Sequence, residues 1–136
     1  MQALILGIHG LTRWVVGLAA IAAVVKFGVG WLGKRKVEQL DVQIGAVVAW
    51  ATTVQFVIGI VNLVAFILAG AFNPAKQIEH AFYGLIATAL SHMAAAQLRK
   101  EGRPDAARFR NAFIMSVLTL VMVFFSVWRL RGGWVW

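Results

Sequence analysis

Four apolar runs, each about long enough to cross a bilayer, fill most of this chain of 136 residues. They cover residues 3–32, 42–72, 78–98 and 109–130. A helix rises ~1.5 Å per residue and the hydrocarbon core is ~30 Å thick, so about 20 residues suffice for one crossing. With 61% hydrophobic and only 13% charged residues, the chain has too little polar surface for a water-soluble domain. The runs therefore predict a chain that folds in lipid.

Backbone groups inside lipid must form hydrogen bonds within their own structure, which allows helices or closed barrels. The runs are continuous and do not alternate with a period of two, so they are not typical of barrel strands. Short connections around Gly33–Asp41, Asn73-Pro74 and Arg99–Arg108 make sequential helices antiparallel. We predict an all-α fold, with residues 1–136 forming one integral membrane domain, a four-transmembrane-helix up-down bundle. The first run is longer than a signal peptide and lacks its basic start, so we expect it to be retained.

The formal charge of +8 has a topological explanation. Most of the basic residues lie in the first and third connections, on the same side of a four-helix topology, whereas the middle connection has only Lys76. These residues are Lys34, Arg35, Lys36, Arg99, Lys100, Arg103, Arg108 and Arg110. This is the positive-inside pattern, and it predicts a multi-pass protein with both termini outside the cytoplasm. We expect these basic residues to contact the anionic bilayer surface and no nucleic acid.

The C-terminal end departs from this charge pattern. Arg129 and Arg131 fall on the outer side, together with Trp128, Trp134 and Trp136. Tryptophan and arginine at the end of an apolar run are typical of an anchor at the membrane interface.

Two histidines are predicted to lie at one depth near the outer face. His9 lies 17 residues before Lys26 and His80 lies 19 residues before Arg99, which is ~25 and ~28 Å along helices of the same direction. Two neutral imidazoles at one depth on neighbouring helices are what a bis-histidine haem b site requires. Alternatively, both rings lie at headgroup level, bonded to water, Glu79 or a lipid phosphate.

Residues near the two histidines fit the first of these interpretations. Gly7, Gly10 and Gly84 would let a porphyrin approach the backbone closely. Arg13, and in second place Arg129, could pair with the haem propionates, because a guanidinium binds carboxylates well.

The remaining polar residues of the runs have a packing explanation. Gln55 and Asn62 share a helix face, and small or hydroxylated residues form a stripe on the last run, at Ser116, Thr119 and Ser126. Such residues let membrane helices approach and bond across them. His92 lies ~18 Å beyond His80 on the same helix, so both cannot ligate one iron. It is left open as an interfacial histidine, a proton-relay group or a lone ligand for a chlorophyll-type pigment.

Short motifs along the chain follow a familiar pattern. They are His9–Trp14, Val54–Gly59, Glu79-His80 with the later His92, Arg99-Lys100, and an aromatic end of the last run. With them the chain resembles a family of small bacterial four-helix integral membrane proteins often labelled cytochrome b-like. The resemblance implies a b-type haem held by His9 and His80, with Arg13 and Trp14 framing the site and Gln55 facing it. In one departure, Trp128-Arg129 stands where we expect a Pro-Trp pair.

The predicted function is that of a small b-type cytochrome-like protein of the bacterial inner membrane, with haem near the outer, periplasmic face. It would transfer electrons to or from a quinone or a periplasmic partner. The alternative is a non-catalytic accessory subunit of a larger respiratory or photosynthetic membrane complex. A transporter is less favoured because no acidic residue lies mid-membrane. Catalysis of its own is not expected, since the chain has no His-x-x-x-His pair, glycine-rich phosphate loop or serine elbow.

Overall fold

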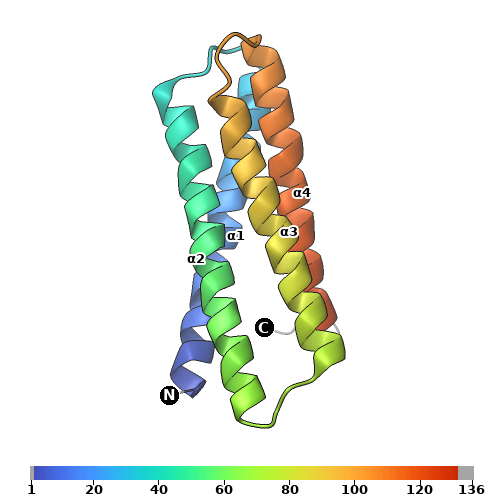
Figure 1. Cartoon of the computed structure of the whole chain (residues 1–136). Coiled ribbons are helices and arrows are strands. Elements are labelled where there is room, and N and C mark those ends of the chain that lie inside the picture. Colours follow the sequence, from blue (N-terminus) through green and yellow to red (C-terminus); the bar gives the residue numbers. More distant parts are fainter. Residues whose placement is uncertain (1, 132–136) are drawn as a thin grey trace.

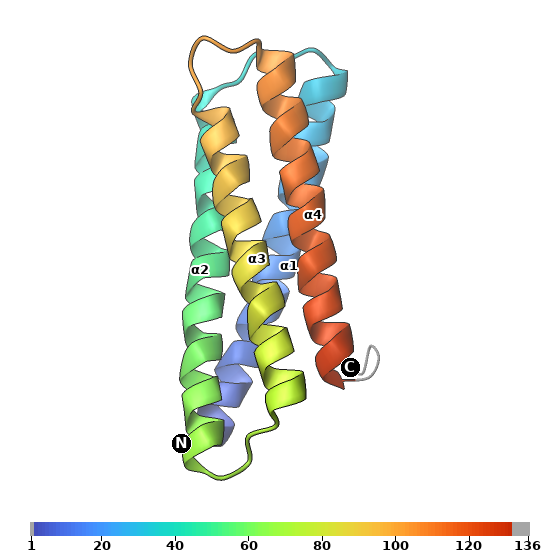
Figure 2. The ribbon, with the colours of Figure 1, turned by 45° about the vertical axis from the view of Figure 1, so that its right-hand side comes forward.

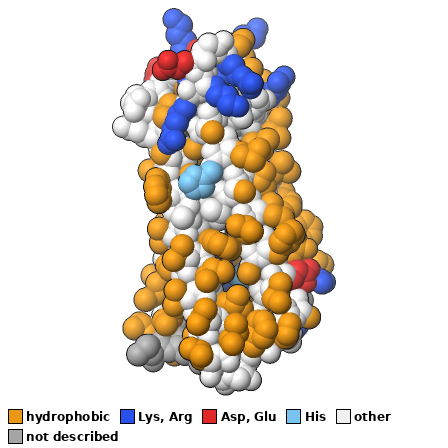
Figure 3. Space-filling view, in the orientation of Figure 1, with side chains coloured by type: hydrophobic (Ala, Val, Ile, Leu, Met, Phe, Trp, Pro, Cys, Tyr) orange, Lys and Arg blue, Asp and Glu red, His pale blue; other side chains and the backbone are white. Residues whose placement is uncertain are grey.

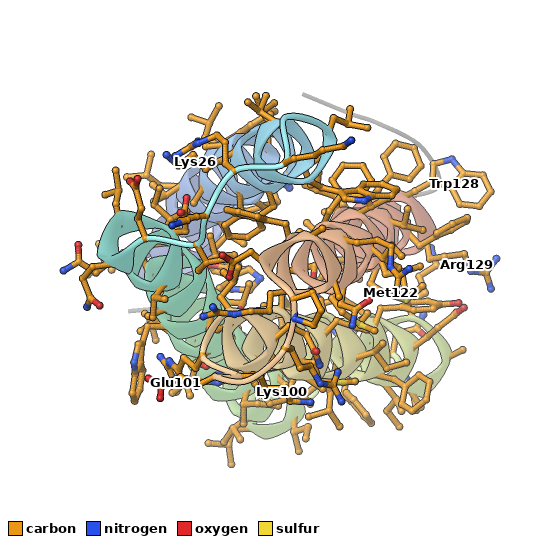
Figure 4. The ribbon with its side chains drawn as sticks, turned by 90° about the horizontal axis from the view of Figure 1, so that it is seen from above. Lys26, Lys100, Glu101, Met122, Trp128 and Arg129 are labelled. Carbon is orange, nitrogen blue, oxygen red and sulfur yellow. The ribbon has the colours of Figure 1, made fainter. Side chains whose placement is uncertain are left out.

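The computed structural model describes residues 2–131 as four helices joined by short connections (Figure 1). Their bounds are α1, Gln2–Leu32; α2, Gln39–Leu68; α3, Pro74–Leu98; and α4, Asp105–Arg131. Each helix packs antiparallel against the next, and α4 closes the ring by packing against α1 (Figures 1 and 2). Seen along the bundle, α1 therefore lies diagonally across from α3, and α2 from α4 (Figure 4). The described residues are all-helical apart from turns and connections, as the apolar runs predicted.

Three helices, α1, α2 and α4, are long and apolar enough to cross a membrane. The third predicted span, in α3, does not reach the same apolar length. It has 25 residues, and polar side chains interrupt it at His80, Ser91, His92 and Gln97. Length and composition thus identify three candidate spans where the sequence predicted four.

Helices α2, α3 and α4 begin earlier than residues 42, 78 and 109, where the apolar runs start. Their first turns are polar, and an apolar run does not include them. At the start of α2, Glu38 and Asp41 form a capping box, in which each side chain accepts a hydrogen bond from the other's backbone N–H. At the start of α3, the Asn73 side chain accepts a hydrogen bond from the Lys76 N–H, and Pro74 occupies the first turn.

The predicted end of the second helix, residue 72, was wrong. The helix ends at Leu68 because Gly70 adopts the left-handed region, with φ of +67°. The Ala71 N–H then donates back to the Phe66 carbonyl at 3.0 Å, which is the hydrogen bond of a Schellman motif. Residues 69–72 are apolar, so hydropathy alone does not mark this end.

The two basic connections lie at one end of the bundle. Lys and Arg side chains gather at the top of Figure 3, and hydrophobic side chains cover most of the surface below them. The α2–α3 connection lies at the opposite end (Figure 1). The charge separation predicted from the sequence is therefore present in the fold.

The tightly packed core occupies the basic half of the bundle. Its buried members are Ala20, Ala23, Phe27, Val48, Leu98, Phe109 and Ala112. Small residues let the helices approach closely there: a Cβ on Gly45 would lie only 3.3 Å from the Ala95 Cα. The fully buried Asp41 of α2 forms an ion pair with Lys26 of α1, with N···O of 3.5 Å. The other half of the bundle contains a cavity.

Replacing Gly45 with valine should separate α2 from α3, because the new side chain would overlap Leu98 and the Ala95 backbone. We expect the free energy of unfolding to fall by about 1–3 kcal/mol, as for other overpacked interiors. Unfolding in detergent followed by circular dichroism measures this. Gly17→Val is the matched control, since a Cβ on Gly17 would have no neighbour within 4 Å. An equal loss of stability in both variants would contradict the packing described here.

Candidate functional site

A cavity of about 310 Å³ lies between the four helices in the half of the bundle away from the basic end. Most of its lining is apolar, and all four helices contribute to it. Its polar lining includes His9, Arg13, Gln55, Asn62, His80 and Ser126. A largely apolar cavity with a few converging polar groups is the usual form of a ligand site.

The two histidines of the cavity face each other across the bundle. His9 belongs to α1 and His80 to α3, and their ring centroids are 6.1 Å apart with the ring planes at 74°. The imidazoles thus lie at one level although their helices are diagonal neighbours. Counting residues from the basic end had predicted this common depth.

His80 is held by Ser126 of α4. The Nδ1 atom of His80 lies 2.9 Å from the Ser126 carbonyl oxygen and 2.7 Å from the Ser126 hydroxyl. The same hydroxyl lies 3.3 Å from the carbonyl oxygen of His80. Both polar contacts of the ring are at Nδ1, which leaves Nε2 available to a ligand.

His9 is held by α2. The Gln55 amide nitrogen donates to the His9 carbonyl at 3.0 Å and lies 3.3 and 3.4 Å from the two ring nitrogens. The Thr12 hydroxyl bonds to the Gln55 amide oxygen, which turns the amide nitrogen toward His9. Gly59 is needed beside this ring, because a Cβ there would lie 3.1 Å from the His9 Cε1.

The structure brings most of the predicted site residues to the cavity. Arg13, Gln55 and Gly84 line it together with the two histidines. Trp14 does not line it among the residues described; its side chain is 42% exposed and stacks with the Arg13 guanidinium, 5.3 Å from the ring centroid. Trp14 follows Arg13 directly, and one residue turns a helix by about 100°, so the indole faces outward.

Gly7 and Gly10 are not among the described residues that line the cavity. A Cβ on either would have no neighbour within 4 Å, so no other helix packs against these glycines. Gly84 does line the cavity, and a Cβ there would lie 3.3 Å from the Phe56 ring of α2.

Arg129 forms an ion pair with Glu79 and is not among the described residues that line the cavity. Its guanidinium binds the Glu79 carboxylate with two hydrogen bonds, of 2.9 and 3.0 Å. Arg129 and Trp128 both project away from the bundle (Figure 4). The suggested pairing of Arg129 with a propionate is therefore not supported, whereas an outward position suits an interfacial anchor. The other predicted anchor residues, Trp134, Trp136 and the Arg131 side chain, lie outside the described part of the chain.

His92 lies on the outer surface of α3, away from the cavity. Its Nε2 atom is 2.8 Å from the Thr53 hydroxyl, and its ring contacts the edge of Trp50 at 6.4 Å between centroids. His92 is exposed, so this polar cluster belongs to the surface shared by α2 and α3.

The sequence pattern predicted only a packing role for Ser126 and Asn62. Both line the cavity, and the Asn62 amide oxygen is buried there without a hydrogen-bond partner among the described residues. Their helical spacing showed that they were on an interior face. The rotation of α4 and α2 about their own axes, which decides what they contact, could not be read from that spacing.

Within residues 2–131 no group of three or more His, Asp or Glu side chains could hold a metal ion. The facing imidazoles provide only two ligand atoms. This set suits a metal whose remaining ligands come with a cofactor, because a porphyrin supplies four nitrogens to its iron.

No family model matches this chain, and no curated protein or solved structure matches it.

Proposed function

We propose that this chain is a small membrane protein that binds haem b between His9 and His80 and transfers electrons. The separation of the two imidazoles is the main support for this proposal. Two bonds of about 2.0 Å from ring nitrogens to one metal, in line with each other, place the ring centres roughly 6 Å apart. The centroids of His9 and His80 are 6.1 Å apart.

The lining of the cavity is compatible with a haem. Its surface is mainly apolar, as the porphyrin face is, and the guanidinium of Arg13, one of the lining residues, could pair with a propionate. Gly59 leaves the His9 ring the space that a side chain would take.

A bound haem would supply one-electron redox chemistry. In this proposal His9 and His80 would hold the iron, and the apolar lining would exclude water from it. Electron transfer needs no general acid or base beside the cofactor. The exchange partner would be a quinone in the bilayer or a protein at the outer face.

We further propose that all four helices cross the bacterial cytoplasmic membrane, with both termini on the outer side. For α3 the support lies in where its polar side chains point. Ser91 bonds to Thr52 of α2 at 2.6 Å, and His80 bonds to Ser126 of α4. Polar groups that are satisfied inside a bundle cost little in lipid.

Purified protein from haem-replete cells should show a Soret band and a sharp α-band on reduction. We expect His9→Ala and His80→Ala to lose the six-coordinate spectrum, because each removes one axial ligand. His92→Ala should leave it unchanged, since His92 lies outside the cavity. Absorption spectra of the oxidised and reduced proteins test this. An unchanged spectrum in His9→Ala, or no haem in the wild type, would contradict the proposal.

The topology can be tested by cysteine labelling, because the chain contains no cysteine. A membrane-impermeant maleimide added to spheroplasts should label Ala71→Cys, in the connection at the outer end. Arg103→Cys, in the basic connection, should react only after lysis. The reverse pattern would show that the proposed orientation is wrong.

A role as an accessory subunit of a larger membrane complex has support from one observation, the exposed cluster of Trp50, Thr53 and His92. An imidazole facing lipid is unfavourable, and a neighbouring protein over this surface would remove that cost. The partner in this case would be another membrane subunit.

Purification in a mild detergent should then yield a complex larger than the single chain. Replacing His92 with leucine should weaken the association without changing any haem spectrum. Size-exclusion chromatography with light scattering measures the molecular mass of the wild type and of His92→Leu. A wild type that is monomeric at all concentrations of mild detergent would exclude this second function.

A further inference from the structure

We propose that the two histidines of the cavity are unequal, and that Ser126 is the positioning residue that makes His80 the stronger metal ligand. This proposal rests on the proposed function, because it assigns roles to the two ligands of that same site. It concerns which ring nitrogen each histidine presents to the cavity.

The partners of His80 determine where its ring proton lies. A carbonyl oxygen can only accept a hydrogen bond, and the Ser126 carbonyl oxygen lies 2.9 Å from Nδ1. Nδ1 must therefore carry the proton. A neutral imidazole has one ring proton, so Nε2 keeps a lone pair. His80 is thus preset in the tautomer that a metal needs at Nε2.

The Ser126 hydroxyl fixes the orientation of the same ring. It can accept from the Nδ1–H at 2.7 Å while donating its own proton to the His80 carbonyl at 3.3 Å. The ring of His80 is thereby tied both to its own backbone on α3 and to α4. A hydrogen bond from the outer ring nitrogen of a ligating histidine also raises the basicity of the ligand nitrogen.

The partner of His9 does not select a ring nitrogen in this way. The Gln55 amide nitrogen lies almost equally far, 3.3 and 3.4 Å, from the two ring nitrogens. A group at equal distance from both nitrogens lies over the ring, whereas the lone pair of an imidazole nitrogen lies in the ring plane. These contacts are also longer than those of His80. Gln55 therefore does not fix the ring proton of His9 at one nitrogen, whereas Ser126 fixes that of His80.

Histidine-selective ¹⁵N NMR of the haem-free protein tests the tautomer directly, at a mildly alkaline pH where imidazoles are neutral. We expect His80 to be protonated at Nδ1 in the wild type. Ser126→Ala keeps the carbonyl, so Nδ1 should stay protonated, but the loss of the hydroxyl contact should shift the Nδ1 resonance. Ser126→Thr keeps the hydroxyl and should behave as the wild type.

Haem titration of the same proteins tests the consequence for binding. We expect the haem dissociation constant to rise about 10-fold in Ser126→Ala, as when an outer hydrogen bond of a metal ligand is lost. The matched control is Ser116→Ala, a buried serine of the same helix that does not line the cavity, and it should keep wild-type affinity. His80→Ala should lose more affinity than His9→Ala.

A wild-type His80 protonated at Nε2 would overturn the proposal, and so would equal haem affinity in Ser126→Ala and Ser116→Ala. If Ser126→Ala does not fold, the proposal is still tested by the ¹⁵N NMR spectrum of the wild type and by the haem affinities of His80→Ala and His9→Ala. A wild type that takes up no haem would refute the function proposed above. The ¹⁵N NMR spectra of the haem-free protein would then still test whether Ser126 keeps His80 protonated at Nδ1.

Discussion

Hydrogen bonds between polar side chains in a largely water-free interior determine how the helices of this bundle are placed. A polar group that faces lipid or an apolar interior needs a partner, and on a helix that partner must come from a neighbour. Thr52 therefore bonds to Ser91 between α2 and α3, and Ser126 bonds to His80 between α3 and α4. Apolar packing alone would tolerate other rotations of the helices. These pairs fix the rotations, and with them the level at which His80 meets His9.

The two halves of the bundle differ in packing: one is filled and the other contains a cavity. At the basic end, small residues bring the helices together and the core is filled. At the other end, the same helices enclose a cavity whose polar groups converge on two imidazoles. The filled half holds the helices in register around the cavity. In this arrangement a short chain encloses a cavity between its helices.

The sequence predicted the elements well and the contacts of the site less well. The lengths of the apolar runs and the separation of the basic connections were enough for four antiparallel helices and a common depth of His9 and His80. The end of α2 at Gly70 depends on local backbone geometry that hydropathy does not contain. The roles of Trp14, Arg129 and Ser126 depend on helix rotation, where one residue corresponds to about 100°. A motif read as consecutive letters therefore placed Trp14 at the cavity, although its helix turns it outward.

We propose that His9 and His80 would both ligate the iron of one haem. Near-infrared magnetic circular dichroism of the purified, oxidised protein reports the identity of both axial ligands at once. We expect a low-spin haem with two imidazole ligands. A spectrum with any other axial pair, or a protein from haem-replete cells with no iron porphyrin at all, would contradict it.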